Sequence, residues 1–215
     1  MKQLYPNIQI VGGEADKVPG ETLGVQDKQV IEINGLKITC FHTPCHTKGH
    51  ISFYVAPAAG EQEGLAHTIE HQAGYQVTKS VNRAVFTGDT IFIGGAGRFF
   101  EGKPEQMCYA MQLARDVWPA DTKMFVGHEY TVANMKFCAT VDGKNQDVLA
   151  MQEKVIKQRA EGFWTVPTLL SEEKKFNVFM RSFDQDIQKI CGTTDPTSTM
   201  GFLREWKNSG KRPSL

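Results

Sequence analysis

The sequence has no excess of either charge and no long apolar run. Its 24 Lys and Arg residues balance 24 Asp and Glu residues, so no net field draws the protein to nucleic acid or to an anionic membrane surface. No apolar stretch approaches the roughly 18 residues of a membrane span, and residues 1–6 contain neither a signal peptide nor an Arg-rich leader. We therefore expect a soluble protein with no nucleic-acid or membrane partner.

Paired cysteine motifs and internal repeats are also lacking. The five cysteines show no repeated CxxC spacing, and a chain of 215 residues, 40% of them apolar, can bury a core without disulfides. This composition excludes fibrous and disordered classes and indicates a reducing compartment. We expect a cytoplasmic protein, with a mitochondrial location as the alternative for a longer form.

The first half of the chain has the patterns of strands and turns. Asn34-Gly35, between two alternating segments, is the strongest short signal of a β-hairpin. Strands are expected at residues 30–33, 36–40, 50–55, 84–86 and 124–126. Pro104 begins a helical pattern that reaches Val117. Residues 57–82, which include His67 and His71, lack periodicity and are interpreted as a surface loop.

The second half changes to helical periodicity. Helices are expected from residue 132 onward and at residues 145–161, 184–191 and 196–207. Asp195-Pro196 is a favourable N-cap followed by proline at the first helical position. Strands followed by helices predict an α+β protein, with a first domain at 1–130 and a helical domain at 131–215.

Three histidines lie four residues apart at His42, His46 and His50. Pro44 and Gly49 argue against a helix there, so the segment is better interpreted as a loop after a strand. Only some of these rings can then point at one centre. A metal ligand and a structural loop histidine are equally good interpretations of this spacing.

Two further polar residues follow predicted strands. Asp89 comes after Thr87-Gly88, and His128 comes after Val126-Gly127. Taken alone, Asp89 is better explained as a turn or helix cap, and His128 as a core histidine. Together with a histidine of the earlier loop, however, they form a set of ligands that zinc and ferrous iron accept. The combined pattern favours a metal site.

Three segments carry a family resemblance: TPCHTKGHISFYV at 43–55, VFTGDTIFIGGAGRFFEG at 85–102 and FVGHEYTVANMKF at 125–137. In this order they resemble the glyoxalase II (hydroxyacylglutathione hydrolase) branch of the metallo-β-lactamase superfamily. The similarity runs over nearly the whole chain, and FMR at 179–181 and TDPTSTM at 194–200 extend it into the tail. It implies an αββα sandwich of the metallo-β-lactamase type, N-terminally incomplete, followed by an all-helical domain.

The resemblance also implies the metal ligands. His46 would bind a first metal ion, His128 a second, and Asp89 would bridge the two as the central catalytic residue. His42 would not be a ligand, and His50 would make a supporting hydrogen bond. Two divalent ions are implied, with zinc expected and iron or manganese as alternatives.

The implied substrate is a glutathione thioester. Arg98, Tyr130, Arg204 and Lys207 correspond to the family's glutathione-binding groups, and Arg and Lys suit the two carboxylates of glutathione. Taken singly, each is more simply explained as a solvated surface residue. Some relatives have tyrosine where this chain has Phe100, so one hydroxyl contact would be absent.

The family's THxHxDH motif, which supplies three histidines and an aspartate, is expected before Tyr5, yet no histidine precedes His42. In one interpretation a longer protein is the hydrolase. In the other, the 215-residue chain is a catalytically silent glutathione-thioester-binding or regulatory module.

The implied reaction is metal-dependent hydrolysis of S-D-lactoylglutathione to glutathione and D-lactate, a step of methylglyoxal detoxification. Rival enzymes on the same fold are a persulfide dioxygenase, an RNA-processing nuclease and a β-lactamase. The balanced charge argues against RNA, and the basic residues of the tail argue for a glutathione thioester. We expect a monomer.

Overall fold

The computed structural model describes residues 3–58, 69–70, 76–77 and 83–214. Its main element is a six-stranded mixed sheet in the order β12-β11-β8-β5-β4-β3. The strands are β3 (Val30–Ile33), β4 (Leu36–His42), β5 (Ile51–Pro57), β8 (Ala84–Gly88), β11 (Lys123–Val126) and β12 (Thr168–Leu169). Neighbours pair antiparallel except β8 and β11, which run parallel. The α+β class is confirmed.

The predicted hairpin forms as expected between β3 and β4. Asn34 and Gly35 have φ angles of 49° and 77°, the left-handed conformations that a tight two-residue hairpin turn requires. Small two-stranded pairs lie outside the main sheet: β1 (Val11–Gly13) with β2 (Leu23–Val25), β6 (Ile69–Glu70) with β7 (Gln76–Val77), and β9 (Ile91–Phe92) with β10 (Gly95–Ala96). Apart from residues 57–58, 69–70 and 76–77, the predicted loop 57–82, with His67 and His71, lies outside the described residues.

The predicted helices begin and end close to their sequence signals, whereas the helix at Leu170–Phe176 was not predicted. They are α1 (Pro104–Gln112), α2 (Thr131–Val141), α3 (Gln146–Ala160), α4 (Leu170–Phe176), α5 (Gln185–Cys191) and α6 (Pro196–Ser209), with a π-helical turn η1 (Leu113–Val117) and a 3-10 turn η2 (Met180–Phe183). Asn145 and Asp195 cap α3 and α6 by accepting hydrogen bonds from the amides of Asp147 and Ser198. Gly192, with φ 74°, ends α5 as predicted.

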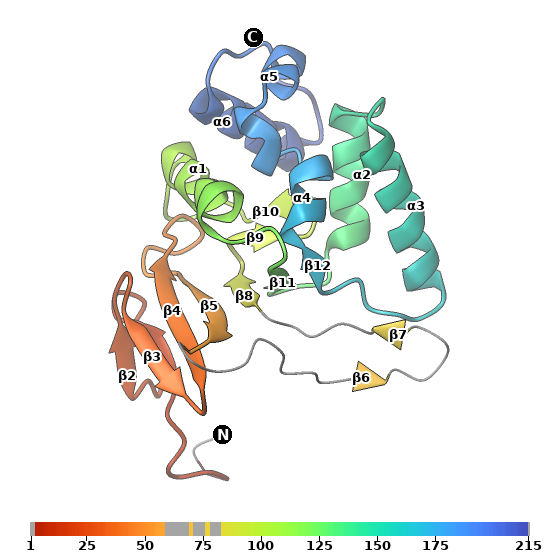
Figure 1. Ribbon diagram of the computed structural model, residues 1–215. Helices are drawn as coiled ribbons and strands as arrows, with labels where there is room; N and C mark the ends of the chain where they lie inside the picture. Colours follow the sequence, from red (N-terminus) through yellow and green to blue (C-terminus); the bar gives the residue numbers. More distant parts are fainter. Residues whose placement is uncertain (1–2, 59–68, 71–75, 78–82, 215) are drawn as a thin grey trace.

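The core lies between one face of the sheet and the helices, which gather on one side of the molecule (Figure 1). Val85 and Met124 are fully buried on this face. Although the second half is mainly helical, its short strand β12 pairs with β11 at the edge of the sheet. None of the described helices is long and apolar enough to cross a membrane.

The opposite face of the sheet is apolar and partly exposed. Phe86 is paired with Phe53 on one side and with Phe125 on the other, so all three side chains share this face. Phe86 is 46% exposed and stacks on Phe125 with ring centroids 5.1 Å apart. A face of this kind differs from the usual solvated face of an antiparallel sheet, which is polar.

Candidate metal centre

Three predicted ligands meet at one edge of the sheet. Asp89 follows β8 and His128 lies two residues beyond β11, and because these strands are parallel neighbours their ends bring the two side chains together. His46 comes from the loop between β4 and β5. Its Nε2 lies 3.5 Å from Asp89 Oδ2, and Nε2 of His128 lies 3.3 Å from the same oxygen. One carboxylate oxygen therefore stands between two imidazoles.

The ring of His46 is oriented by a backbone carbonyl. Its Nδ1 lies 3.1 Å from the backbone carbonyl of Arg98. A carbonyl oxygen can only accept, so Nδ1 carries the hydrogen of this contact, and the other ring nitrogen, Nε2, is the one that faces Asp89. A backbone acceptor on the far nitrogen is the usual way in which a protein orients a metal-binding histidine.

Glycines make room for Asp89. A Cβ on Gly127 would lie 2.2 Å from Asp89 Oδ1, and a Cβ on Gly97 would lie 1.9 Å from the Asp89 carbonyl oxygen. Gly88 has a φ of +49°, and a Cβ there would lie 2.6 Å from Nε2 of His50. A side chain at Gly127 would therefore displace the carboxylate, one at Gly97 would displace the Asp89 backbone, and one at Gly88 would displace His50.

The three side chains fit part of a divalent metal site. Imidazole nitrogen and carboxylate oxygen are ligands that zinc, iron and manganese accept, and both Nε2 atoms face the shared carboxylate. Within the described part of the chain, however, no group of three or more His, Cys, Asp or Glu side chains forms a complete metal-binding cluster. The described residues thus place one oxygen of the Asp89 carboxylate within 3.5 Å of a ring nitrogen of each histidine.

The other two histidines of the loop are engaged elsewhere. His50 Nδ1 lies 2.9 Å from the hydroxyls of both Thr43 and Thr90. Burial lowers the pKa of His50 to about 4, so the ring is neutral at physiological pH. His42 Nε2 lies 2.8 Å from the Lys48 carbonyl. His50 therefore makes a supporting hydrogen bond next to Asp89, as expected.

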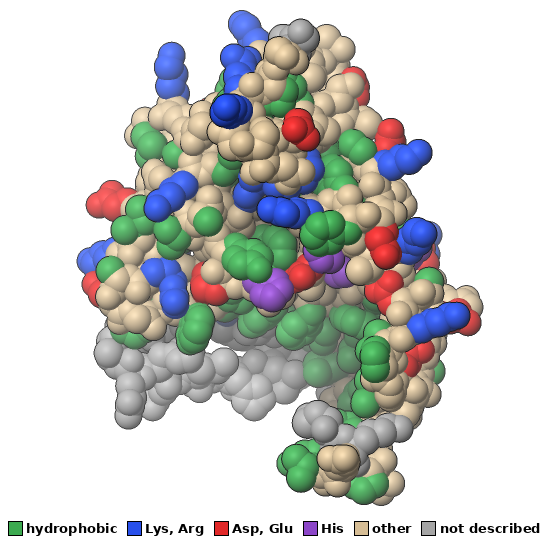
Figure 2. Space-filling model, turned by 180° about the vertical axis from the view of Figure 1, so that it is seen from behind, with side chains coloured by type: hydrophobic (Ala, Val, Ile, Leu, Met, Phe, Trp, Pro, Cys, Tyr) green, Lys and Arg blue, Asp and Glu red, His purple; other side chains and the backbone are tan. Residues whose placement is uncertain are grey.

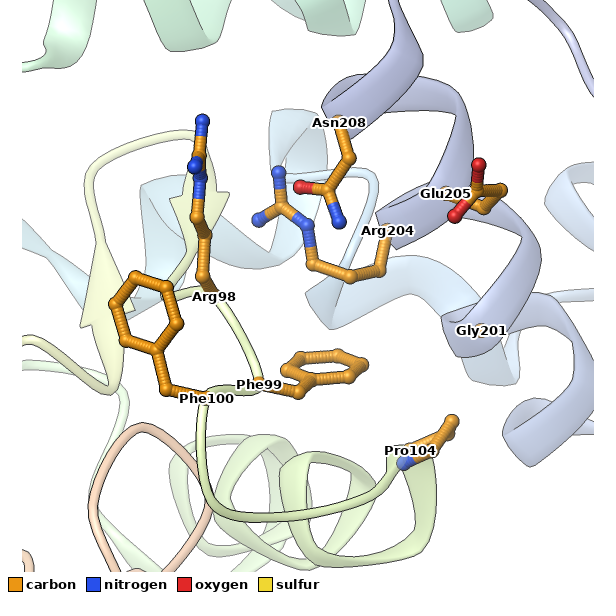
Figure 3. A pocket seen from close by; sticks show the side chains of 8 residues that line it. All are labelled: Arg98, Phe99, Phe100, Pro104, Gly201, Arg204, Glu205 and Asn208. Carbon is orange, nitrogen blue, oxygen red and sulfur yellow. The ribbon is translucent and has the colours of Figure 1, made fainter.

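A cationic pocket lies beside this centre. It has a volume of about 360 Å³ and is lined by Arg98, Phe99, Phe100, Pro104, Gly201, Arg204, Glu205 and Asn208. In Figure 3 the Arg204 guanidinium lies between the side chains of Arg98 and Asn208, whereas Glu205 points away. Burial and the nearby charge of Arg98 lower the pKa of Arg204 to about 10. Two guanidinium groups that repel each other favour an anionic ligand.

Arg204 and Lys207 are anchored side chains, in contrast to solvated surface charges. Arg204 Nη1 donates to the Ala96 carbonyl at 3.0 Å, and its buried Nε has no hydrogen-bond partner among the described residues. Lys207 donates to Asn134 Oδ1 and lies over the ring of Phe179 at 5.7 Å. Burial lowers the pKa of Lys207 to about 8. These contacts were not evident from the sequence.

Aromatic rings flank the two candidate ligands. Tyr130 is half exposed and stacks on His128, with ring centroids 4.9 Å apart. Phe100 is exposed and lies 4.9 Å from the His46 ring. Figure 2 shows histidine side chains at the surface of this face, with hydrophobic side chains beside them and Lys and Arg side chains gathered above.

Two acidic side chains that hold the segments with His46 and His128 were not identified from the sequence. Asp16 accepts hydrogen bonds from the Thr47 hydroxyl at 2.7 Å and from the Gly49 amide at 2.8 Å, on the loop that carries His46. Glu129, next to His128, accepts from the amide of Thr165 at 2.9 Å. Glu129 lies inside the GHEYT motif, but nothing in the motif indicates its partner.

Comparisons with known proteins place the chain among related sequences. Residues 129–210 match the family described as hydroxyacylglutathione hydrolase C-terminus. A protein of Arabidopsis thaliana named cytoplasmic hydroxyacylglutathione hydrolase is 38% identical over 209 residues, which are 97% of this chain and 73% of that relative. The chain belongs to the hydroxyacylglutathione hydrolase family. A hydroxyacylglutathione hydrolase of Synechocystis is 36% identical over 207 residues, again 73% of the relative.

Solved structures show the fold of this hydroxyacylglutathione hydrolase family member. A metallo-β-lactamase of Staphylococcus aureus superposes with a TM-score of 0.52 at 19% identity, over 96% of this chain and 53% of that one. ETHE1 of Myxococcus xanthus superposes with a TM-score of 0.51 at 17% identity, over 98% of this chain and 62% of that one. The chain therefore spans about half to three fifths of these proteins. The predicted metallo-β-lactamase-like fold is confirmed.

Proposed function

We propose that this chain takes part in the metal-dependent hydrolysis of S-2-hydroxyacylglutathione thioesters, with S-D-lactoylglutathione as the substrate. The observation that carries the proposal is the shared oxygen of Asp89 between His46 and His128, beside a pocket with two guanidinium groups. The family membership supports the same reaction class. Glutathione and D-lactate would be the products, which is a step in methylglyoxal detoxification.

His46, His128 and Asp89 would hold divalent ions, with zinc first and iron or manganese as alternatives. When bound, such ions lower the pKa of water to about 7 and polarise a carbonyl. The residues of the chain then orient the substrate. The leaving thiol of glutathione has a pKa of about 8.5, so no strong general acid is required from the protein.

The substrate would be held by the cationic pocket. Arg98 and Arg204, which line the pocket, would bind a carboxylate of glutathione through their guanidinium groups. Lys207, whose Nζ lies over the ring of Phe179, would add a further positive charge. The half-exposed ring of Tyr130, stacked on His128, would bring a phenol group next to the thioester.

We further propose that residues 1–130 carry the metal-binding part and residues 131–215 the glutathione-binding part. The match of the family's C-terminal region to residues 129–210 supports this division. A cytoplasmic location is proposed because the Arabidopsis relative is named cytoplasmic. A monomer is proposed for the oligomeric state.

A second candidate is a silent module that binds glutathione thioesters without hydrolysing them. It is favoured by the finding that the described residues form no complete metal cluster. The test is hydrolysis of S-D-lactoylglutathione by the purified chain, with bound metal quantified and Asp89→Ala as the comparison. Metal-dependent turnover that Asp89→Ala abolishes supports the hydrolase. A folded chain that binds the thioester, binds no metal and shows no turnover supports the silent module.

A further inference from the structure

Residues 97–103 run alongside the loop that carries His46. The Nδ1–H of His46 donates to the Arg98 carbonyl at 3.1 Å, and the amide of Glu101 donates to the Cys45 carbonyl at 3.2 Å. The Glu101 side chain in turn accepts a hydrogen bond from the Lys48 amide at 2.7 Å. The residue before His46, the ring of His46 and the residue two positions after it are therefore all held by one short segment.

The same segment forms one wall of the cationic pocket. Arg98, Phe99 and Phe100 line it, and the ring of Phe100 also lies 4.9 Å from the ring of His46. A Cβ on Gly102 would lie 2.5 Å from the Cys45 Cα, so the two segments pack without space between them. A change on either side of this contact is thus transmitted to the other, because close-packed groups cannot shift independently.

We propose that Glu101 is a positioning residue for His46. Glu101 holds the loop so that Nε2 of His46 faces Asp89, and it couples the pocket to the metal centre. Among these three hydrogen bonds, the Glu101 carboxylate is the one side-chain group that residues 97–103 contribute, since Arg98 and Glu101 otherwise use backbone atoms. Naming His46 as a metal ligand rests on the proposed function. The hydrogen-bond geometry of the loop is independent of the proposed function.

Removal of Glu101 should leave the loop folded. Asp16 holds the loop independently from its other side, through the Thr47 hydroxyl and the Gly49 amide. In Glu101→Ala the Lys48 amide loses its partner, so the loop is held less firmly against residues 97–103, and the His46 ring should lose its contact with the Arg98 carbonyl. Loss of such outer partners weakens metal binding by about 10- to 100-fold. In Glu101→Gln the amide oxygen can still accept from Lys48, so binding should remain near the wild-type value.

The test combines two measurements on the 215-residue chain. Long-range ¹H–¹⁵N NMR on the metal-free protein reports the tautomer of each histidine ring, with the His46 signals assigned by their loss in His46→Gln. Calorimetric titration with zinc then gives the affinity. Glu105→Ala is the matched control, because this exposed carboxylate lies four residues further along and, among the described residues, makes no hydrogen bond to the loop.

The wild type, Glu101→Gln and Glu105→Ala should show His46 protonated at Nδ1, and Glu101→Ala should lose this state and bind zinc at least about 10-fold more weakly. The proposal is overturned if Glu101→Ala keeps the wild-type tautomer, or if the wild type is not protonated at Nδ1. If the chain binds no zinc, the tautomer of His46 alone tests the proposal. A lack of thioesterase activity would contradict the proposed function but would leave this result unchanged.

Discussion

Glu173 joins the helical half to the segment that leads into the candidate site, and its environment predicts a pH-dependent stability. The carboxylate is fully buried and accepts hydrogen bonds from the Gly94 amide at 3.0 Å, the Thr168 hydroxyl at 2.9 Å and the Asn177 amide group at 3.0 Å. Burial is the main cause that raises the pKa of Glu173 from 4.5 to about 7, and these hydrogen bonds offset only part of it.

The sign of the effect follows from this shift. The folded state binds a proton more tightly than the unfolded state, so the stability associated with Glu173 is fully present below pH 4.5 and is lost as the pH rises through about 7. At about 1.4 kcal/mol per pH unit, the loss between pH 5 and 8 is roughly 2 to 3 kcal/mol. Glu173→Gln cannot titrate and should not show this loss.

Urea unfolding followed by tryptophan fluorescence at pH 5, 6, 7 and 8 measures the effect, because Trp118 is buried in the native core. The free energy of unfolding of Glu173→Gln minus that of the wild type should rise by roughly 2 to 3 kcal/mol from pH 5 to 8. Glu153→Gln, an exposed residue of α3, is the control and should show no such trend. A difference for Glu173→Gln that stays constant over this range would refute the reasoning.

Three further predictions concern the site and the helices. Gly127→Ala should abolish zinc binding in calorimetry while the circular dichroism spectrum is retained, because its Cβ would lie 2.2 Å from Asp89 Oδ1. Affinity for glutathione, measured by titration, should fall as the pH rises through about 8, where Lys207 loses its charge, and Lys207→Met should remove this dependence. Asn145→Ala should lower the free energy of unfolding by about 1 kcal/mol in urea titrations, because it removes the N-cap of α3.

Features with local signals could be predicted from the sequence. The hairpin turn at Asn34-Gly35 needs two positive φ angles, and Asn and Gly adopt these most easily. The ends of α5 and α6 also depend on residues within one turn, such as Gly192 and Asp195. By contrast, β12 is only two residues long, and its strand character comes from pairing with β11 across more than 40 residues of chain.

Prediction of the site had the same limit. The motifs indicated His46, Asp89 and His128 as ligands, and the structure brings these three side chains together. The partners that orient them could not be predicted, since the carbonyl that holds His46 lies 52 residues away in the chain. Likewise, Lys207 meets its acceptor Asn134 across 73 residues. Such pairs depend on how helices and sheet pack, which no local periodicity encodes.

The apolar face of the sheet should govern how the protein behaves in solution. Phe86 and its neighbours Phe53 and Phe125 form an apolar surface, and burying it by association lowers the free energy. This hydrophobic driving force strengthens on warming and with sulfate, which is excluded from protein surfaces. The balance of 24 basic and 24 acidic residues provides little long-range repulsion near neutral pH to oppose it. The solubility limit should therefore fall with rising temperature and with added ammonium sulfate, so cold, sulfate-free buffers are the favourable conditions for handling this chain.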